Sequence, residues 1–216
     1  MNPSRFFTLL FLLLCGIATV RAHPVAQGSM EVNVLPDHIT VRTRVSNEQV
    51  FVAGTFGKNS AAPAGDLWAL HGPYLLDHLR LEADGRPLEG KVLHVSVPDD
   101  KTTGGYASYE LRYETPSTDT PLRELRLRQD LLNEIEFAPG NMWEATLVLR
   151  QSQEGKVVRE GLLFTHKEPI VLACNRAGDS SPVLDRAALA GSYFHHGMNH
   201  ILEGWDHLLF MAGLVL

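Results

Sequence analysis

The stretch His38-Ile-Thr-Val-Arg-Thr-Arg-Val45 alternates between two kinds of side chain. One set, which is apolar except for a single threonine, comprises Ile39, Val41, Thr43 and Val45. Thr40 and two arginines make up the other set. A period of two is that of a half-buried strand, because successive side chains of a strand point to opposite faces. The stretch therefore predicts a β-strand with one face in a core.

The same alternation recurs in residues 109–113, 125–128 and 143–150. Residues 79–88 read as a strand that runs into an Asp84-Gly85 turn, with 92–97 as the return strand. Several short strands at such spacing favour an antiparallel sandwich. We therefore expect residues 23–174 to form a mainly β domain, similar to an antiparallel β-sandwich.

One short helix is predicted within residues 65–79, with Asp66 as its N-cap and Gly72-Pro73 breaking or bending it. His71, Asp77 and His78 lie in this segment. We favour reading them as surface residues of a helix-to-strand junction. The alternative is a second cluster of metal ligands.

Residues 1–22 are typical of a secretory signal, with Arg5 ahead of an apolar run and small residues at Val20-Arg-Ala22. An uncleaved signal anchor is the alternative. Cleavage would leave Cys174 as the only cysteine, so no disulfide could form within the domain. We expect residues 23–190 on the periplasmic or extracellular side of a bacterial inner membrane. Residues 175–190 read as a linker.

Residues 191–216 predict a helix that begins polar and becomes apolar. His196, His200, Glu203 and His207 are spaced four, three and four apart, so they fall on one stripe of a helix, within about 60° of one another. Asp206 lies beside the stripe. Ionisable groups in a membrane usually face a bundle interior, a wet cavity or an ion, so the stripe predicts a metal or proton site. A structural polar network and an interfacial or soluble helix are the alternatives.

The apolar run stops at Leu216, short of the 20 or so residues that a spanning helix needs. We therefore expect a fragment that is cut within its first, incomplete transmembrane helix. Its partners would be the lipid bilayer and the remaining membrane helices of a longer product. The net charge of −6 argues against nucleic acid as a partner.

The motif Gly197-x-x-His200-Ile-x-x-Gly204-x-Asp206-His207-Leu-Leu-Phe210 resembles the first membrane helix of the HupE/UreJ family. The order of segments resembles the branch in which a signal peptide and an exported β-rich domain precede the membrane bundle. The resemblance implies a nickel or cobalt permease, or an accessory protein with metalloenzyme-maturation partners. It points to His200, Asp206 and His207 as metal-handling positions, whereas His196 and Glu203 come from helix geometry alone.

Imidazole and carboxylate together suit nickel, cobalt, copper or zinc. Cleavage would make His23 the mature N-terminus, where its amine and imidazole could chelate copper or nickel. We prefer the alternative interpretation, in which His23-Pro24 only provides a favourable context for signal cleavage. We see no nucleophile or phosphate-loop motif and predict that the chain is not an enzyme. Two other functions stay open. One is a membrane-tethered periplasmic binding or interaction module without transport. The other is an intramembrane metal-dependent hydrolase that uses Glu203 or Asp206 as a base.

Overall fold

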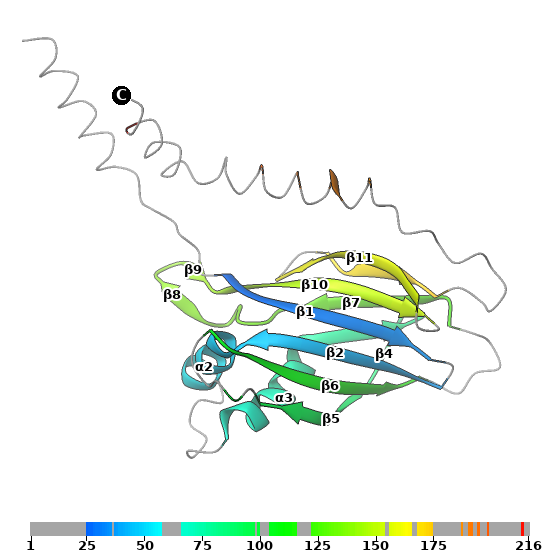
Figure 1. Ribbon diagram of the computed structural model, residues 1–216, viewed down its shortest axis with the longest axis horizontal. Helices are drawn as coiled ribbons and strands as arrows, with labels where there is room; N and C mark the ends of the chain where they lie inside the picture. Colours follow the sequence, from blue (N-terminus) through cyan, green and yellow to red (C-terminus); the bar gives the residue numbers. More distant parts are fainter. Residues whose placement is uncertain are drawn as a thin grey trace, which may run out of the picture. The chain divides into compact units, whose positions relative to one another are not determined.

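The computed structural model describes residues 25–35, 37–57, 66–97, 104–115, 122–153, 156–165 and 168–174, together with Asp99 and single positions near the C-terminus (Figure 1). The chain divides into two compact units. One comprises Met1–Ala22 and Ala190–Leu216, and the other comprises His23–Leu189. Every strand of the described residues belongs to the second unit, which is a mainly β structure as predicted.

The elements of the β unit follow one another along the chain in this order: β1 (Val25–Val34), β2 (His38–Ser46), α2 (Asn47–Phe56), α3 (Leu67–His78), β3 (Leu79–Ala83), β4 (Arg86–Pro87), β5 (Gly90–Ser96), β6 (Tyr106–Glu114), β7 (Glu124–Gln129), β8 (Glu136–Ala138), β9 (Asn141–Met142), β10 (Glu144–Gln153), β11 (Lys156–Phe164) and β12 (Ile170–Ala173). They form a six-stranded sheet in the order β11-β10-β1-β2-β6-β5 and a four-stranded sheet in the order β12-β7-β3-β4. β8 and β9 pair only with each other.

Strand pairing is antiparallel throughout the described residues except at one place. β1 and β10 run parallel, in a register that starts at Val25 opposite Glu144 and ends at Val34 opposite Gln153. The prediction of an antiparallel sandwich is therefore wrong for this central pair. Most of the domain lies between the two strands, so no short turn constrains their relative direction.

The two sheets contribute to a single hydrophobic core. In β2 the side chains of Ile39, Val41, Thr43 and Val45 are all fully buried, which confirms the predicted inner face. The predicted alternation also holds in β6, β7 and β10. Each fully buried Leu, Ile or Val contributes about 1.5–3 kcal/mol relative to an exposed one, so these faces supply the main stabilisation of the fold.

The Asp84-Gly85 turn is confirmed, with positive φ angles of 49° and 79° that suit the turn of a tight hairpin. Its return strand, however, is the two-residue β4 rather than residues 92–97. The strand that covers most of that range, β5, pairs with β6 in the other sheet. Pro87 has no N–H to donate, which is tolerated because β4 is an edge strand, and the next residue still pairs: the Leu88 N–H donates to the Leu81 carbonyl at 2.9 Å.

α3 is confirmed, and the Asp66 carboxylate caps it by accepting a hydrogen bond of 3.1 Å from the Trp68 backbone N–H. Gly72-Pro73 does not break the helix, which runs on to His78. Gly72 lies against Val92, whose Cγ2 would be only 3.0 Å from a Cβ at this position. The glycine thus lets the helix approach β5 closely.

α2 was not predicted. The Ser46 hydroxyl caps it by accepting a hydrogen bond of 3.2 Å from the Gln49 backbone N–H. Ser46 and Gln49 have the spacing of a capping box, which is a signal of a helix start. The helix packs on α3, where Phe51 meets Trp68 edge to face.

Within the predicted C-terminal helix, the structure describes Gly191, Phe194, Met198 and Gly213, and each of them is helical. Among the residues that can be described, no helix is both long and apolar enough to cross a bilayer. The membrane-spanning character of residues 191–216 stays a prediction.

Candidate functional site

The predicted metal stripe falls outside the described part of the chain. This holds for His196, His200, Glu203, Asp206 and His207, and also for His23. Their role as ligands therefore stays a prediction. The structure does describe the other histidine group that the sequence singled out, on α3.

The α3 histidines are not the surface group that we predicted. His71 is only 3% exposed, and His78 is half-buried, whereas Asp77 is exposed. At about 100° per residue, His71 and His78 lie within about 20° of each other round the helix, with Tyr74 beside them, whereas Asp77 lies about 120° from His71. The predicted trio is thus split between the interior and the solvent.

Three rings on this face form a stack. The ring centroids of His71 and Tyr74 are 5.0 Å apart, and those of Tyr74 and His78 are 4.1 Å apart, with 28° between the planes in both pairs. Tyr109 of β6 closes the inner end, 5.5 Å from His71. We call His71, Tyr74 and His78 the ring stack; it joins α3 to the six-stranded sheet.

Hydrogen bonds hold each member of the ring stack. Gln49 of α2 places its Nε2 at 3.3 Å from Nε2 of His71. His78 donates from Nδ1 to the Tyr74 carbonyl at 2.9 Å, and its Nε2 is 3.6 Å from Glu134 Oε2. The Tyr74 hydroxyl accepts from the Leu132 backbone N–H at 2.8 Å. The ring stack therefore links α2, α3 and the turn after β7.

Burial keeps the inner part of the ring stack uncharged. It lowers the pKa of His71 to about 3, with a smaller contribution from the nearby His78. It also raises the pKa of Tyr74 well above its usual range, and the charges of Glu134 and Asp130 act in the same direction. A neutral imidazole that already has a hydrogen-bond partner and two ring neighbours fits a packing role in the domain interior.

No three His, Cys, Asp or Glu side chains of the described residues come close enough together to hold a metal ion. Cys174 is free and buried. Burial raises the pKa of its thiol to about 12, so it is neither a ready nucleophile nor a ready thiolate ligand.

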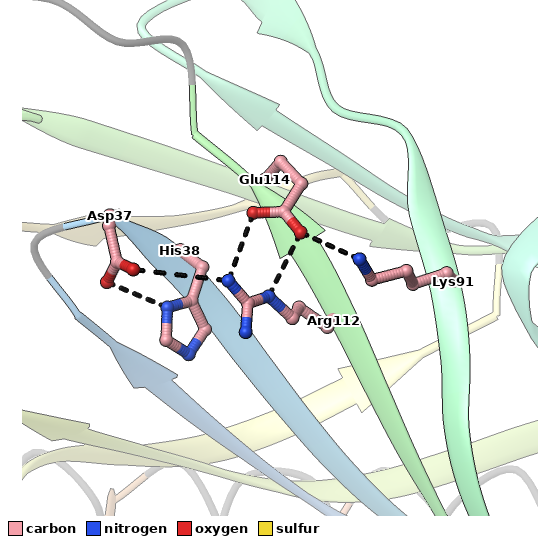
Figure 2. Close-up of polar contacts among 5 residues, drawn as sticks. All are labelled: Asp37, His38, Lys91, Arg112 and Glu114. Atoms are coloured by element: carbon pink, nitrogen blue, oxygen red, sulfur yellow. Dashed lines mark hydrogen bonds and ion pairs between the residues drawn. The ribbon is translucent and has the colours of Figure 1, made fainter.

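A second polar group lies on the exposed side of the six-stranded sheet (Figure 2). Arg112 of β6 forms two hydrogen bonds with Glu114, from Nε at 3.0 Å and from a terminal nitrogen at 3.3 Å. Lys91 of β5 adds a contact of 2.9 Å to the same carboxylate. At the start of β2, His38 Nδ1 is 2.8 Å from an Asp37 oxygen, and Asp37 lies 3.9 Å from Arg112.

These contacts hold both carboxylates in their charged form. Lys91 and Arg112 lower the pKa of Glu114, and the hydrogen bond from His38 lowers the pKa of Asp37. Exposed ion pairs of this kind each contribute little to stability, about 0–1 kcal/mol. The group joins the ends of β2, β5 and β6, and its charges are matched internally.

Sequence reasoning missed the residues that complete the ring stack. Gln49 could have been found through the capping-box spacing from Ser46, which marks the start of α2. Glu134 carries no local signal, because it lies in a turn far from α3 in the chain. Only the tertiary fold brings it to His78.

No protein-family model matches this chain, and no curated protein matches it. The assignment of function therefore depends on the chemistry of its own residues.

Proposed function

We propose that this chain belongs to a membrane-associated protein that handles a divalent transition metal, in transport or in metallocentre assembly, with residues 23–174 as its exported β domain. The observation that carries the proposal is the spacing of His196, His200, Glu203 and His207 ahead of an apolar run. This is the arrangement that a helix needs to present several imidazoles and a carboxylate on one side.

The β unit is compatible with export. It has its own hydrophobic core, drawn from both sheets and from both helices. Its cysteine is free and buried, so the core alone has to hold the unit together. A unit of this size is large enough to do so.

The histidines of α3 support a division in which the β unit has a structural role and the C-terminal segment handles the metal. His71 is buried and held by Gln49, and His78 is held by the Tyr74 carbonyl. Both are engaged in packing the domain. Metal handling is therefore assigned to the C-terminal histidines, not to the cluster on α3.

The ligand types favour a metal that must be released again. Neutral imidazoles with one or two carboxylates suit nickel, cobalt, copper or zinc, and they bind less permanently than a thiolate cage. A carboxylate also offsets the charge of the ion where little water is present.

Nickel binding to the full chain in detergent tests the proposal. We expect the His200→Ala/His207→Ala double variant to lose about tenfold or more in nickel affinity by equilibrium dialysis, because each lost ligand typically costs at least as much as a lost second-shell partner. His94→Ala, which removes an exposed histidine of β5, is the matched control and should bind as the wild type does. Equal affinity in all three proteins would contradict the ligand role.

Transport or assembly requires a second measurement. Cells that express the chain together with the remaining membrane helices of the proposed transporter should accumulate nickel, and the double variant in the same protein should reduce this accumulation to the level of cells without it. Unchanged accumulation in the double variant would rule out a role for His200 and His207 in metal movement.

A further inference from the structure

The turn formed by residues 130–135 follows β7 and meets the end of α3; we call it the 130–135 turn. One contact is between backbones, where the Asp130 N–H donates to the His78 carbonyl at 3.1 Å. Another is between side chains, where Nε2 of His78 lies 3.6 Å from Oε2 of Glu134. The imidazole and the carboxylate are both largely buried, with 23% and 13% of their side chains exposed. His78 therefore meets the turn through its backbone and through its ring.

Leu132 makes the 130–135 turn dependent on its surroundings. Its φ angle of 63° lies in the left-handed region, which a bulky residue adopts only where neighbouring structure holds it. Its N–H donates to the Tyr74 hydroxyl of α3 at 2.8 Å. The turn also supports the β8–β9 hairpin, because the Ile135 N–H donates to the Leu132 carbonyl at 3.0 Å and accepts the Trp143 N–H on its own carbonyl at 2.8 Å. Whatever fastens the turn to α3 thus steadies a hairpin whose strands pair only with each other.

The side-chain contact depends on the protonation of His78. Nδ1 lies 2.9 Å from the Tyr74 carbonyl, which can only accept a hydrogen bond, so Nδ1 carries the ring proton. In the neutral imidazole Nε2 then has a lone pair, and it faces a carboxylate oxygen that can also only accept. Oε2 of Glu134 is buried and has no hydrogen-bond partner among the described residues. A proton on Nε2 would supply the donor that this oxygen lacks.

The charges around His78 leave Glu134 as its counterion. The other carboxylate of the turn, Asp130, is already paired with Arg80 of β3 at 3.2 Å. Glu134 has no ion pair other than that with His78 in the described part of the chain. A charged imidazole would therefore neutralise a buried carboxylate that nothing else neutralises.

The other groups of α3 do not oppose a charge on His78. Burial keeps both neighbours in the ring stack neutral, because it lowers the pKa of His71 to about 3 and raises the pKa of Tyr74 above its usual range. His78 is the last residue of α3, where the helix dipole favours a positive charge. Asp77 is exposed and lies on another side of the helix.

We propose that His78 and Glu134 form a pH-sensitive latch that fastens the 130–135 turn, and with it the β8–β9 hairpin, to α3. When His78 takes a proton from the solvent, Nε2 donates to Glu134 Oε2 and the latch closes. As the pH rises, the imidazole returns this proton and the latch opens. Histidines change charge between about pH 5 and 8, a range that solvent outside a cell can cover. Both residues lie in the β unit, so the latch does not depend on the proposed metal handling.

Hydrogen exchange of the full chain in detergent tests the latch. Peptides that cover residues 130–135 are followed by mass spectrometry at about pH 5 and about pH 8, with rates corrected for the intrinsic pH dependence of amide exchange. Peptides from β2 and β6 are the internal reference, because loss of stability through His71 in acid would affect the whole domain. That loss also has the opposite sign, so it cannot imitate a closing latch.

We expect the 130–135 peptides to exchange about threefold more slowly at the lower pH, which is the effect of an ion pair of modest strength. His78→Gln and Glu134→Gln each remove one partner, and both should abolish this difference. His94→Gln removes an exposed histidine of β5 and should keep it. Thermal unfolding at about pH 8, where the latch is open, shows whether each variant is folded.

Two results would overturn the inference. One is equal protection of the 130–135 peptides at the two pH values in the wild type. The other is a pH dependence that persists in either His78→Gln or Glu134→Gln, since the effect would then belong to another group. Because the two variants change opposite partners of one contact, misfolding of one leaves the other to decide.

Discussion

The Gln49 side chain of α2 meets the imidazole of His71 on α3 inside the domain, with 3.3 Å between the two Nε2 atoms. Both residues are buried, although only α3 was predicted from the sequence. Because of this contact, protonation of His71 would disturb the packing of α2 against α3.

Acid should destabilise the domain through His71. The pKa of this imidazole is about 3 in the folded protein and near 6.5 when unfolded, so the unfolded chain binds more protons between these values. Stability is therefore lost as the pH falls from about 6.5 towards 3. Lowering the pH from 7 to 5 should cost about 2 kcal/mol through this group.

Urea denaturation at pH 7 and pH 5 measures that loss. His71→Gln should show a smaller loss than the wild type, because its side chain does not titrate. His94→Gln removes an exposed histidine and should behave as the wild type does. An equal pH dependence in wild type and His71→Gln would contradict the prediction.

Tyr109 and Tyr113 should respond differently to loss of their hydroxyl groups. Both are buried on β6, but the Tyr113 hydroxyl donates to the Leu79 carbonyl at 3.4 Å, whereas the Tyr109 hydroxyl has no hydrogen-bond partner among the described residues. Tyr113→Phe should cost about 0.5–1 kcal/mol, and Tyr109→Phe should be neutral or stabilising. Thermal unfolding of the two variants makes the comparison, and a larger loss in Tyr109→Phe would refute it.

Replacing Gln129 should lower the free energy of unfolding of the domain markedly. At the buried end of β7 its Nε2 donates to the Ala145 carbonyl at 2.8 Å and to the Thr165 hydroxyl at 3.2 Å, while its Oε1 accepts from the Leu131 N–H at 2.9 Å. Gln129→Leu would leave the buried Leu131 N–H unpaired and would remove one hydrogen bond from the Thr165 hydroxyl, at a cost of about 1–3 kcal/mol. Gln27→Leu, at an exposed position of β1, is the control for urea denaturation. Similar midpoints for both variants would show that the network contributes little.

Cys174 should react with a thiol reagent only when the domain unfolds. Burial raises the pKa of the thiol to about 12, so almost none of it is thiolate near neutral pH. We expect no reaction with a disulfide reagent under native conditions and one equivalent of reaction in urea, once the signal segment with Cys15 is removed. Rapid native labelling would mean that this end of the core opens readily.

Local signals in the sequence determined the faces of the strands and the start of α3. The alternation around Ile39 and Val41 has a period of two, which is enough to tell which side chains are buried. The Asp84-Gly85 turn and the Asp66 cap depend on one or two residues each, so both were predictable. The predicted C-terminal stripe has the same local origin, since it follows from helical spacing alone.

The tertiary structure decided what depends on distant partners. It alone set β1 parallel to β10 and sent β5 to the other sheet, because strand pairing is chosen by packing between segments that are far apart in the chain. It also buried His71, whose spacing on α3 is the same whether the helix lies on a surface or in a core. Periodicity is a property of one segment, whereas burial of a polar group requires a partner such as Gln49, and only the fold brings that partner to it.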